Sequence, residues 1–160
     1  MSERLFGTDG IRGRAGEGPL VPEFLRRIGH ALGERVGHSA RVVIGHDGRA
    51  SGPGIVHALA EGLAAAGCLA EEIGLCTTPS LAFVAGSGPY LAGVMVSASH
   101  NPAEDNGVKL FGPDGAKLPD AAELELEQAL RRTSPDLPAG RGAIEAHPEA
   151  FIVGNLGWGL

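Results

Sequence analysis

The spacing of hydrophobic residues along the chain predicts alternating helices and strands. Between residues 22 and 36, apolar side chains recur every three or four positions, with charged residues between them. This pattern predicts an amphipathic helix with a proline in its first turn. Similar spacing predicts helices at residues 54–66 and 121–132, and a shorter helix is expected at residues 80–85. Gly67 follows the helix at residues 54–66 where a helix C-cap is expected.

Short runs of β-branched and other apolar residues lie between these helices and predict strands. They occupy residues 41–45, 69–75, 90–96 and 108–111, and the third run is the most apolar. Strands that alternate with helices favour a mostly parallel sheet, because right-handed crossovers place the helices on its faces. The sequence therefore predicts an α/β fold, in the form of a three-layer α/β/α domain with a mostly parallel mixed sheet.

The last part of the chain differs from the rest. Residues 133–150 contain several prolines among small residues, which indicates a linker, and the ten residues that follow are apolar and rich in glycine. We expect one domain over residues 1–132. Residues 133–160 are then a linker and tail, either the stub of a second domain or a frayed end.

Composition and charge narrow the class of protein. With 160 residues, 43% of them hydrophobic, the chain can bury one sizeable core. A net charge of -6 and only 13 scattered lysines and arginines argue against a nucleic-acid partner, although a local site for a small anion is compatible with them. No apolar run approaches the roughly 20 residues that a membrane helix needs, and the first residues lack a signal-peptide pattern, so we expect a cytoplasmic protein without a membrane partner. Cys68 and Cys76 fit neither a disulfide framework nor a zinc spacing and are expected to be reduced thiols in or near the core.

A dense polar cluster follows the most apolar predicted strand. The sequence VMV at residues 94–96 gives way to SASHNP at residues 97–102 and DNGVK at residues 105–109. A second polar loop, HDGRAS at residues 46–51, follows the strand predicted at residues 41–45. In open α/β sheets, ligands bind at the carboxyl ends of the strands. Both loops are therefore candidates for a binding site.

The cluster contains two candidate nucleophiles, Ser97 and Ser99. An acyl-transfer site is disfavoured, because the adjacent His100 rarely points at its neighbour and no Gly-x-Ser-x-Gly elbow is present. Phosphoryl chemistry fits better, because Asn101 and Lys109 bring an amide and a point charge to one loop. The sequence has neither the phosphate-binding loop of nucleotide enzymes nor an intact dinucleotide fingerprint. Composition alone leaves open an ordinary loop whose polar side chains cap backbone groups.

Four stretches, in this order and spacing, resemble the first domain of the α-D-phosphohexomutases. They are FGTDGIRG at residues 6–13, GHDGR at residues 45–49, SASHNP at residues 97–102 and DNGVK at residues 105–109. The early position of the first stretch and the form GVMVSASHNP are most similar to the bacterial phosphoglucosamine mutase branch. The resemblance covers residues 1–132 and so one domain of a multidomain enzyme family.

The resemblance implies a function for this domain. Ser99 would carry a phosphate in the resting enzyme, pass it to a hydroxyl of an amino-hexose phosphate, and be rephosphorylated from the resulting bisphosphorylated intermediate. Glucosamine 6-phosphate and glucosamine 1-phosphate would thereby be interconverted. Mg²⁺ would bind through the phosphate on Ser99 and withdraw charge from the transferred group, with its other ligands outside this chain. The alternatives are a fragment of a phosphomannomutase or phosphoglucomutase, and a non-catalytic phosphosugar-binding module.

The resemblance also implies roles for residues around Ser99. Lys109 would be an acid/base or charge-stabilising group, Arg12 would turn into the active site, and His100 and Asn101 would line the phosphoserine loop. The family's metal, sugar and second phosphate loops belong to later domains. A hexosamine phosphate and the missing C-terminal domains are therefore the expected partners, and the isolated chain is expected to be inactive.

The loop at residues 46–51 is expected to have a supporting role. By resemblance, Asp47 and Arg49 form an internal ion pair near the site, and Ser97 satisfies backbone groups beside the nucleophile. Position 48 is glycine where relatives usually have threonine, so details of this loop differ from the family pattern.

Overall fold

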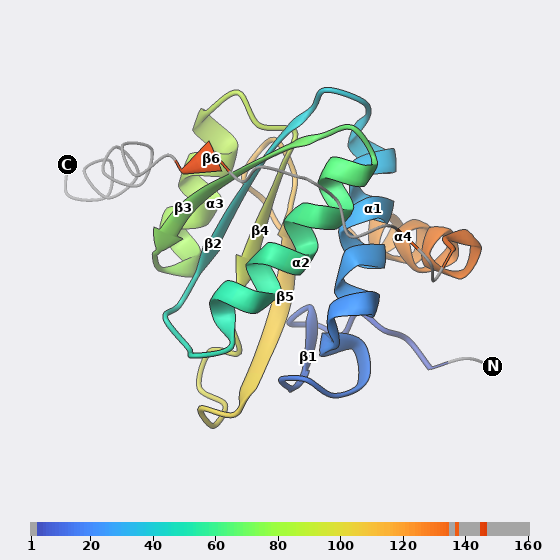
Figure 1. Ribbon diagram of the computed structural model, residues 1–160. Helices are drawn as coiled ribbons and strands as arrows, with labels where there is room; N and C mark the ends of the chain where they lie inside the picture. Colours follow the sequence, from blue (N-terminus) through green and yellow to red (C-terminus); the bar gives the residue numbers. More distant parts are fainter. Residues whose placement is uncertain (1–2, 135–136, 138–144, 147–160) are drawn as a thin grey trace.

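The computed structural model describes residues 3–134, 137 and 145–146, and its described strands form a single mixed sheet (Figure 1). The order across the sheet is β1-β5-β4-β2-β3-β6. Strands β4, β2, β3 and β6 run parallel, whereas β5 lies antiparallel to both β4 and β1. The strands are β1 (Ile11–Arg14), β2 (Arg41–His46), β3 (Leu69–Leu75), β4 (Ala92–Val96), β5 (Asp105–Phe111) and β6 (Glu145–Ala146).

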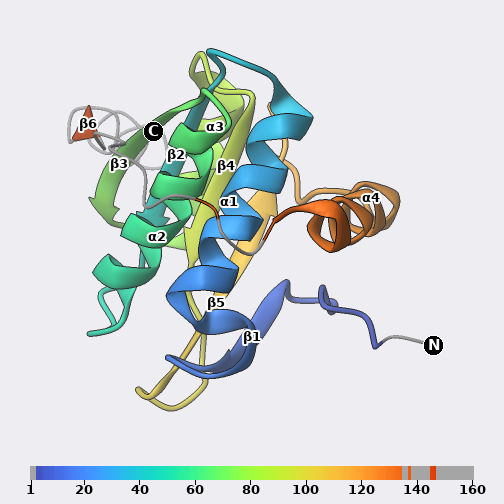
Figure 2. The same ribbon diagram turned by 45° about the vertical axis from the view of Figure 1, so that its right-hand side comes forward.

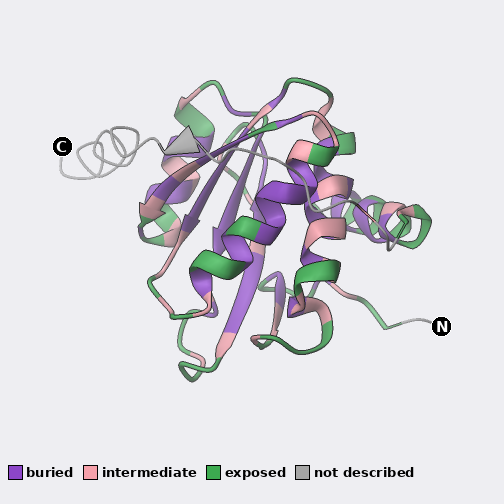
Figure 3. Cartoon of the chain, in the orientation of Figure 1, coloured by how far each residue is buried: buried purple, intermediate pink, exposed green. Residues whose placement is uncertain are grey.

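Helices cover both faces of the sheet. Helices α1, α2 and α4 pack on one face and α3 packs on the other (Figures 1 and 2). Successive side chains of a strand point to opposite faces, so Val42 joins the core beneath α1 and α2 while Val43 joins the core beneath α3. Figure 3 shows the buried central strands between helices that expose their outer sides. The predicted three-layer fold is confirmed. The helices are α1 (Pro22–Val36), α2 (Gly52–Ala65), α3 (Thr78–Ser87) and α4 (Asp120–Arg132), with a short 3-10 turn, η1 (Gly18–Leu20), before α1.

The predicted elements exist, with shifts at their ends and two omissions. Helix α1 and strand β3 have the predicted bounds, whereas β5 begins three residues before the predicted residue 108. Strand β1 was not predicted, because only one of its four residues is apolar; its backbone becomes a strand by pairing with β5. Within the predicted linker, residues 145 and 146 form the short strand β6, which was not predicted and pairs in parallel with β3. The predicted tail, residues 151–160, lies outside the described residues.

The end of α2 has the predicted glycine cap. Gly67 has φ of 84°, a left-handed conformation that glycine adopts without steric cost. The Gly67 N–H donates to the Ala64 carbonyl at 2.9 Å, and the Cys68 N–H donates to the Leu63 carbonyl at 3.0 Å. These are the two hydrogen bonds of a Schellman motif. They end the helix and turn the chain into β3.

Helices α1 and α2 approach each other closely because glycines face the contact. A Cβ atom on Gly29 of α1 would lie 2.1 Å from the Leu59 carbonyl oxygen, and one on Gly62 of α2 would lie 1.9 Å from the Arg26 carbonyl oxygen. Both distances are far inside van der Waals contact. Any larger residue at either position would force the helix backbones apart.

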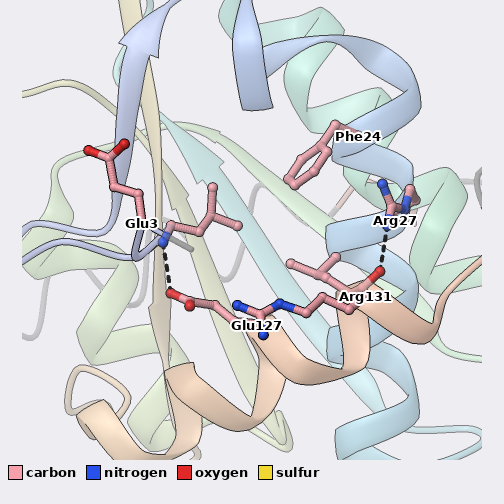
Figure 4. Close-up of a pocket in the computed structure, with 7 residues that line it drawn as sticks. Glu3, Phe24, Arg27, Glu127 and Arg131 are labelled. Atoms are coloured by element: carbon pink, nitrogen blue, oxygen red, sulfur yellow. Dashed lines mark hydrogen bonds between the residues drawn. The ribbon is translucent and has the colours of Figure 1, made fainter. Parts of the chain in front are cut away.

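The chain before β1 is fastened to α4. The Glu127 carboxylate accepts hydrogen bonds from the N–H groups of Leu5 and Phe6, both at 2.9 Å. Nearby, the Arg27 guanidinium donates to the Leu130 carbonyl in the last turn of α4, where a positive charge suits the helix dipole. Figure 4 shows the bond between Glu127 and the Leu5 N–H and the bond from Arg27, around a cavity of about 240 Å³. Helix α4 thus helps to fix the segment that leads into β1.

Two expectations about the chain as a whole can be compared with the structure. Cys68 and Cys76 are buried free thiols, as expected. Within residues 3–134, no helix is both long enough and apolar enough to cross a membrane.

We predict that Gly29→Ala destabilises the fold. Alanine is the better helix former by about 1 kcal/mol, but overpacking at a close helix contact typically costs about 1–3 kcal/mol or more. The free energy of unfolding, measured by urea denaturation, should therefore fall. Gly54→Ala is the matched control, because Gly54 is also helical and a Cβ atom there meets nothing within 4 Å. A stable Gly29→Ala variant, equal to Gly54→Ala, would contradict the close contact.

Candidate functional site

The two predicted polar loops lie together at one edge of the sheet, the lower edge in Figure 1. His46 at the end of β2 lies in register with Val96 at the end of β4. The ladder continues into the loops, since the Asp47 N–H donates to the Val96 carbonyl at 3.2 Å and the Ser97 N–H donates to the Gly107 carbonyl at 3.0 Å. The parallel pairing of β2 and β4 therefore places Asp47 and Ser97 side by side.

The two serines of the cluster have different surroundings. The Ser97 hydroxyl donates to Asp47 Oδ2 at 2.7 Å and accepts a hydrogen bond from the Ser99 N–H at 3.0 Å. Ser99 is exposed, and its hydroxyl makes no hydrogen bond within the described part of the chain. Ser99 therefore has the hydroxyl that is free to react, while the Ser97 hydroxyl is engaged in both directions.

Arg49 connects the two loops to the start of β5. Its Nε lies 3.1 Å from Asp47 Oδ2, its Nη2 donates to the Ser99 carbonyl at 2.8 Å, and its Nη1 donates to the carbonyls of Asp105, at 3.2 Å, and Pro102. The side chains of Asp47 and Arg49 are only 23% and 12% exposed, so solvent screens this ion pair less than a pair on the open surface. The guanidinium holds three chain segments in one arrangement.

The pKa of Asp47 reflects these contacts. Partial burial raises the pKa of the carboxyl, but hydrogen bonds from Ser97 and Arg49, together with the charge of Arg49, outweigh the burial and lower it below its ordinary value of 3.8. Asp47 is therefore ionised at neutral pH, and its carboxylate accepts a charge-assisted hydrogen bond from the Ser97 hydroxyl.

Arg12 and Lys109 emerge on the same face of the sheet as Ser97. Arg12 of β1 lies opposite Gly107 of β5, and Lys109 lies opposite Met95 of β4. A Cβ atom on Gly107 would lie 3.1 Å from Arg12 Cγ and 2.6 Å from the Ser97 carbonyl oxygen, so the Arg12 side chain crosses the space that this glycine leaves open. Arg12 Nε is buried and has no hydrogen-bond partner among the described residues. The pairing of β1 with β5 thus places Arg12 opposite Gly107, the residue whose carbonyl accepts the Ser97 N–H.

The remaining predicted residues lie in the loop itself. Asn101 Nδ2 donates to Asp105 Oδ2 at 3.1 Å, which closes the loop from Ser99 to β5. His100 is exposed and makes no hydrogen bond in the described part of the structure. Among the predicted residues, Asp47, Arg49 and Ser97 are therefore linked around the Ser99 backbone, and Asn101 is bonded to Asp105. The side chains of Arg12, His100 and Lys109 make no hydrogen bond to this group in the described part of the structure.

Sequence reasoning missed a buried amide next to the site. Asn106 is fully buried; its Nδ2 donates to the Ser51 hydroxyl at 2.8 Å, and its Oδ1 accepts the Gly107 N–H at 2.9 Å. It ties β5 to the start of α2. The available signal was a polar residue with a short amide side chain directly before the apolar run of β5.

A cavity of about 590 Å³ opens beside the two serines, on the face that α3 covers in part. Asp47, Ser97 and Ser99 form one wall, Cys76 and Met95 supply apolar surface, and Thr77 at the start of α3 adds a hydroxyl. Burial raises the pKa of the Cys76 thiol to about 12, so this thiol stays protonated and does not act as a nucleophile at neutral pH. The exposed Ser99 hydroxyl, which has no hydrogen bond among the described residues, is the candidate nucleophile at this cavity.

The expected magnesium ion finds no complete ligand set among the residues that the structure describes. Within the described residues, no three histidine, cysteine, aspartate or glutamate side chains converge as metal ligands do. The ionised Asp47 is already paired with Arg49. The described residues alone therefore do not form a magnesium site.

The chain as a whole has a counterpart in a known family. A family model described as phosphoglucomutase/phosphomannomutase, alpha/beta/alpha domain I, matches residues 3–136. The chain belongs to this domain I family.

Curated relatives of this domain I chain are phosphoglucosamine mutases. The protein of that name from Hahella chejuensis is 45% identical over 144 residues, which cover 88% of this chain and 32% of the relative. One from Thermus thermophilus is 44% identical over 135 residues, which cover 82% of this chain and 31% of the relative. The chain thus spans about a third of the length of the curated relatives it matches.

Solved structures carry the same fold. A putative phosphomannomutase, also from Thermus thermophilus, superposes with a TM-score of 0.78 at 31% identity, over 92% of this chain and 34% of that one. A phosphoglucomutase/phosphomannomutase family protein from Burkholderia thailandensis gives a TM-score of 0.76 at 32% identity, over 92% of this chain and 33% of that one. The predicted family resemblance is confirmed.

We predict that Asp47→Asn lowers stability at neutral pH but not in acid. Because the folded-state pKa of Asp47 lies below the unfolded value of 3.8, its ionised form stabilises the fold. This contribution is complete above pH 3.8 and disappears as the pH falls through the lower folded-state pKa. Urea denaturation of the two proteins between pH 7 and pH 3 should show a difference that shrinks at the acid end.

Asp120→Asn is the control for this experiment, since Asp120 is exposed in the first turn of α4. Its effect should be small across the same pH range. A stability difference for Asp47→Asn that does not change with pH would rule out the ionised carboxylate as its source.

Proposed function

We propose that this chain is the phosphoserine-bearing domain of a phosphoglucosamine mutase, which interconverts glucosamine 6-phosphate and glucosamine 1-phosphate. The observation that carries the proposal is the free, exposed hydroxyl of Ser99 beside a cavity, next to a Ser97 hydroxyl that is fully engaged. The names of the curated relatives support the choice of substrate.

The chemistry consists of two phosphoryl transfers. In the first, the bond between phosphorus and Ser99 Oγ breaks as phosphorus bonds to a hydroxyl oxygen of the sugar phosphate. The proton of that sugar hydroxyl passes to a base, and Ser99 Oγ takes up a proton as it leaves. In the second, Ser99 attacks the other phosphate of the bisphosphorylated sugar and the proton transfers run in reverse. The enzyme regains its phosphate, and the sugar has exchanged its phosphorylated position.

Positioning and charge neutralisation are the main needs of such a transfer. A phosphoserine carries about -1.5 to -2 charges at neutral pH. Asp47 and Arg49 neutralise each other, so the positive charge has to come from other groups. Arg12, with its unpaired buried Nε, and Lys109, on the same face of the sheet, are the candidates, and Lys109 is also the candidate for proton transfer.

His100 and Asn101 line the loop in this proposal, and Asn101 acts by holding Asp105. A magnesium ion would take only the Ser99 phosphate from this chain, so its further ligands belong to the rest of the mutase. The sugar-selecting groups belong there too, since this chain spans about a third of its relatives.

We predict that the 160-residue chain accepts one phosphoryl group on Ser99. The purified chain should be analysed by intact mass and tandem mass spectrometry before and after incubation with glucosamine 1,6-bisphosphate. One phosphate mapped to Ser99 is expected, absent in Ser99→Ala and retained in the control Ser87→Ala, because Ser87 lies on α3, where its hydroxyl donates to the Phe83 carbonyl. A phosphate on Ser97, or none on the unsubstituted chain, would refute the assignment.

We further predict that the isolated chain does not turn over. A cycle of two transfers also needs the sugar to present each of its two positions to Ser99 in turn, and the sugar-binding groups for this are assigned by the proposal to the rest of the mutase. Conversion of glucosamine 6-phosphate, followed by phosphorus NMR, should remain at the level of a buffer blank. Measurable turnover by the purified chain would show that these residues form a complete active site.

A further inference from the structure

The backbone of Ser99 has an unusual conformation. Among the described residues, Ser39 and Ser99 are the two residues other than glycine with positive φ, at 66° and 54°. This left-handed region is sterically unfavourable for a residue with a side chain, and it persists at a site only where surrounding contacts determine it. Some contacts must therefore hold Ser99 in place.

Both polar backbone groups of Ser99 are held by side chains. Its N–H donates to the Ser97 hydroxyl at 3.0 Å, and its carbonyl accepts from Arg49 Nη2 at 2.8 Å. Both of these partners also donate to the same atom, Asp47 Oδ2, which accepts hydrogen bonds from the Ser97 hydroxyl at 2.7 Å and from Arg49 Nε at 3.1 Å. One carboxylate oxygen therefore orients the two groups that grip Ser99.

We propose that Asp47 is a positioning residue for Ser99, acting through the Ser97 hydroxyl on one side and the Arg49 guanidinium on the other. Asp47 accepts a hydrogen bond from the Ser97 hydroxyl, and this turns a lone pair of the Ser97 hydroxyl oxygen toward the Ser99 N–H. The same carboxylate holds Arg49 against the Ser99 carbonyl. The backbone of Ser99 is thereby fixed in its left-handed conformation, and its hydroxyl projects outward.

The same contacts leave little of the Arg49 guanidinium free to bind a phosphate. Arg49 has five N–H groups, and four of them are used on Asp47, Ser99, Pro102 and Asp105. A guanidinium committed to backbone carbonyls acts on the shape of the loop. The consequence for phosphoryl transfer rests on the function proposed above, whereas the conformational effect does not.

The conformational part is tested on the 160-residue chain by NMR. In Asp47→Asn and in Ser97→Ala, the Ser99 amide should exchange with solvent roughly tenfold faster, because its acceptor is lost or no longer oriented. The three-bond HN–Hα coupling of Ser99 should also change as its φ leaves the left-handed region. Ser97→Thr keeps the hydroxyl and should restore both values.

Two internal references separate this effect from general loosening. The amide of Ser39, the other left-handed serine, donates to the Gly67 carbonyl at 2.8 Å far from Asp47, and its exchange should not change. The amides of β4 should stay protected, which shows that each variant is folded; if Asp47→Asn does not fold, Ser97→Ala decides. Unchanged Ser99 exchange and coupling in a folded variant would overturn the proposal.

The catalytic part is tested by the rate at which Ser99 gains a phosphate from glucosamine 1,6-bisphosphate. Asp47→Asn should slow this rate at least tenfold, while Asp120→Asn should leave it unchanged. A slowed rate together with an altered Ser99 amide supports the positioning role, and an unaltered rate overturns it. If the unsubstituted chain gains no phosphate, the proposed function fails, and the NMR comparison alone still decides whether Asp47 positions Ser99.

Discussion

The guanidinium of Arg49 is the point at which three separate parts of the candidate site meet. It lies on the loop after β2, contacts the backbone of the loop after β4, and reaches the first residue of β5. A loop that presents an exposed hydroxyl cannot be stabilised by burying that hydroxyl. Its conformation is instead fixed by hydrogen bonds from side chains to its backbone N–H and carbonyl groups. The planar fork of an arginine suits this task, because its several N–H groups point in fixed directions toward different carbonyls. Asp47 in turn supplies the charge that keeps Arg49 in the interior.

The layers behind this edge make the arrangement rigid. Helices α1 and α2 pack closely enough that Gly29 and Gly62 meet backbone atoms, and the buried faces of β2, β4 and β5 form a continuous core with them. On the opposite face, α3 covers only part of the sheet, and the uncovered part contains the cavity beside Ser99. The unequal covering of the two faces therefore explains why a pocket exists on one face, at the edge where the strands end.

Much of this could be predicted from the sequence, for reasons that differ between residues. The amphipathic pattern of α1 and the apolar run of β4 are local signals, and the polar residues after β2 and β4 follow from the rule that parallel strands end at one edge. Strand β1 could not be found, because Ile-Arg-Gly-Arg becomes a strand only through its pairing with β5. The roles of Asn106 and Glu127 were equally hidden, since each bonds to a segment distant in sequence. Sequence motifs identified Ser99, but only the hydrogen bonds of Ser97 give a physical reason to distinguish the two serines.

The bond between Glu127 and the backbone of Leu5 and Phe6 has a consequence for where this domain can be divided. The segment that it holds continues into β1 and Arg12, so the position of an N-terminal arginine depends on a helix near the other end of the domain. In a hybrid of two homologues, the segment before β1 and helix α4 would therefore have to come from the same parent. A crossover placed between β5 and α4 would combine Glu127 from one parent with the segment around Leu5 and Phe6 from the other. The position of Arg12 would then depend on whether the two parents still form the hydrogen bonds between this glutamate and that segment.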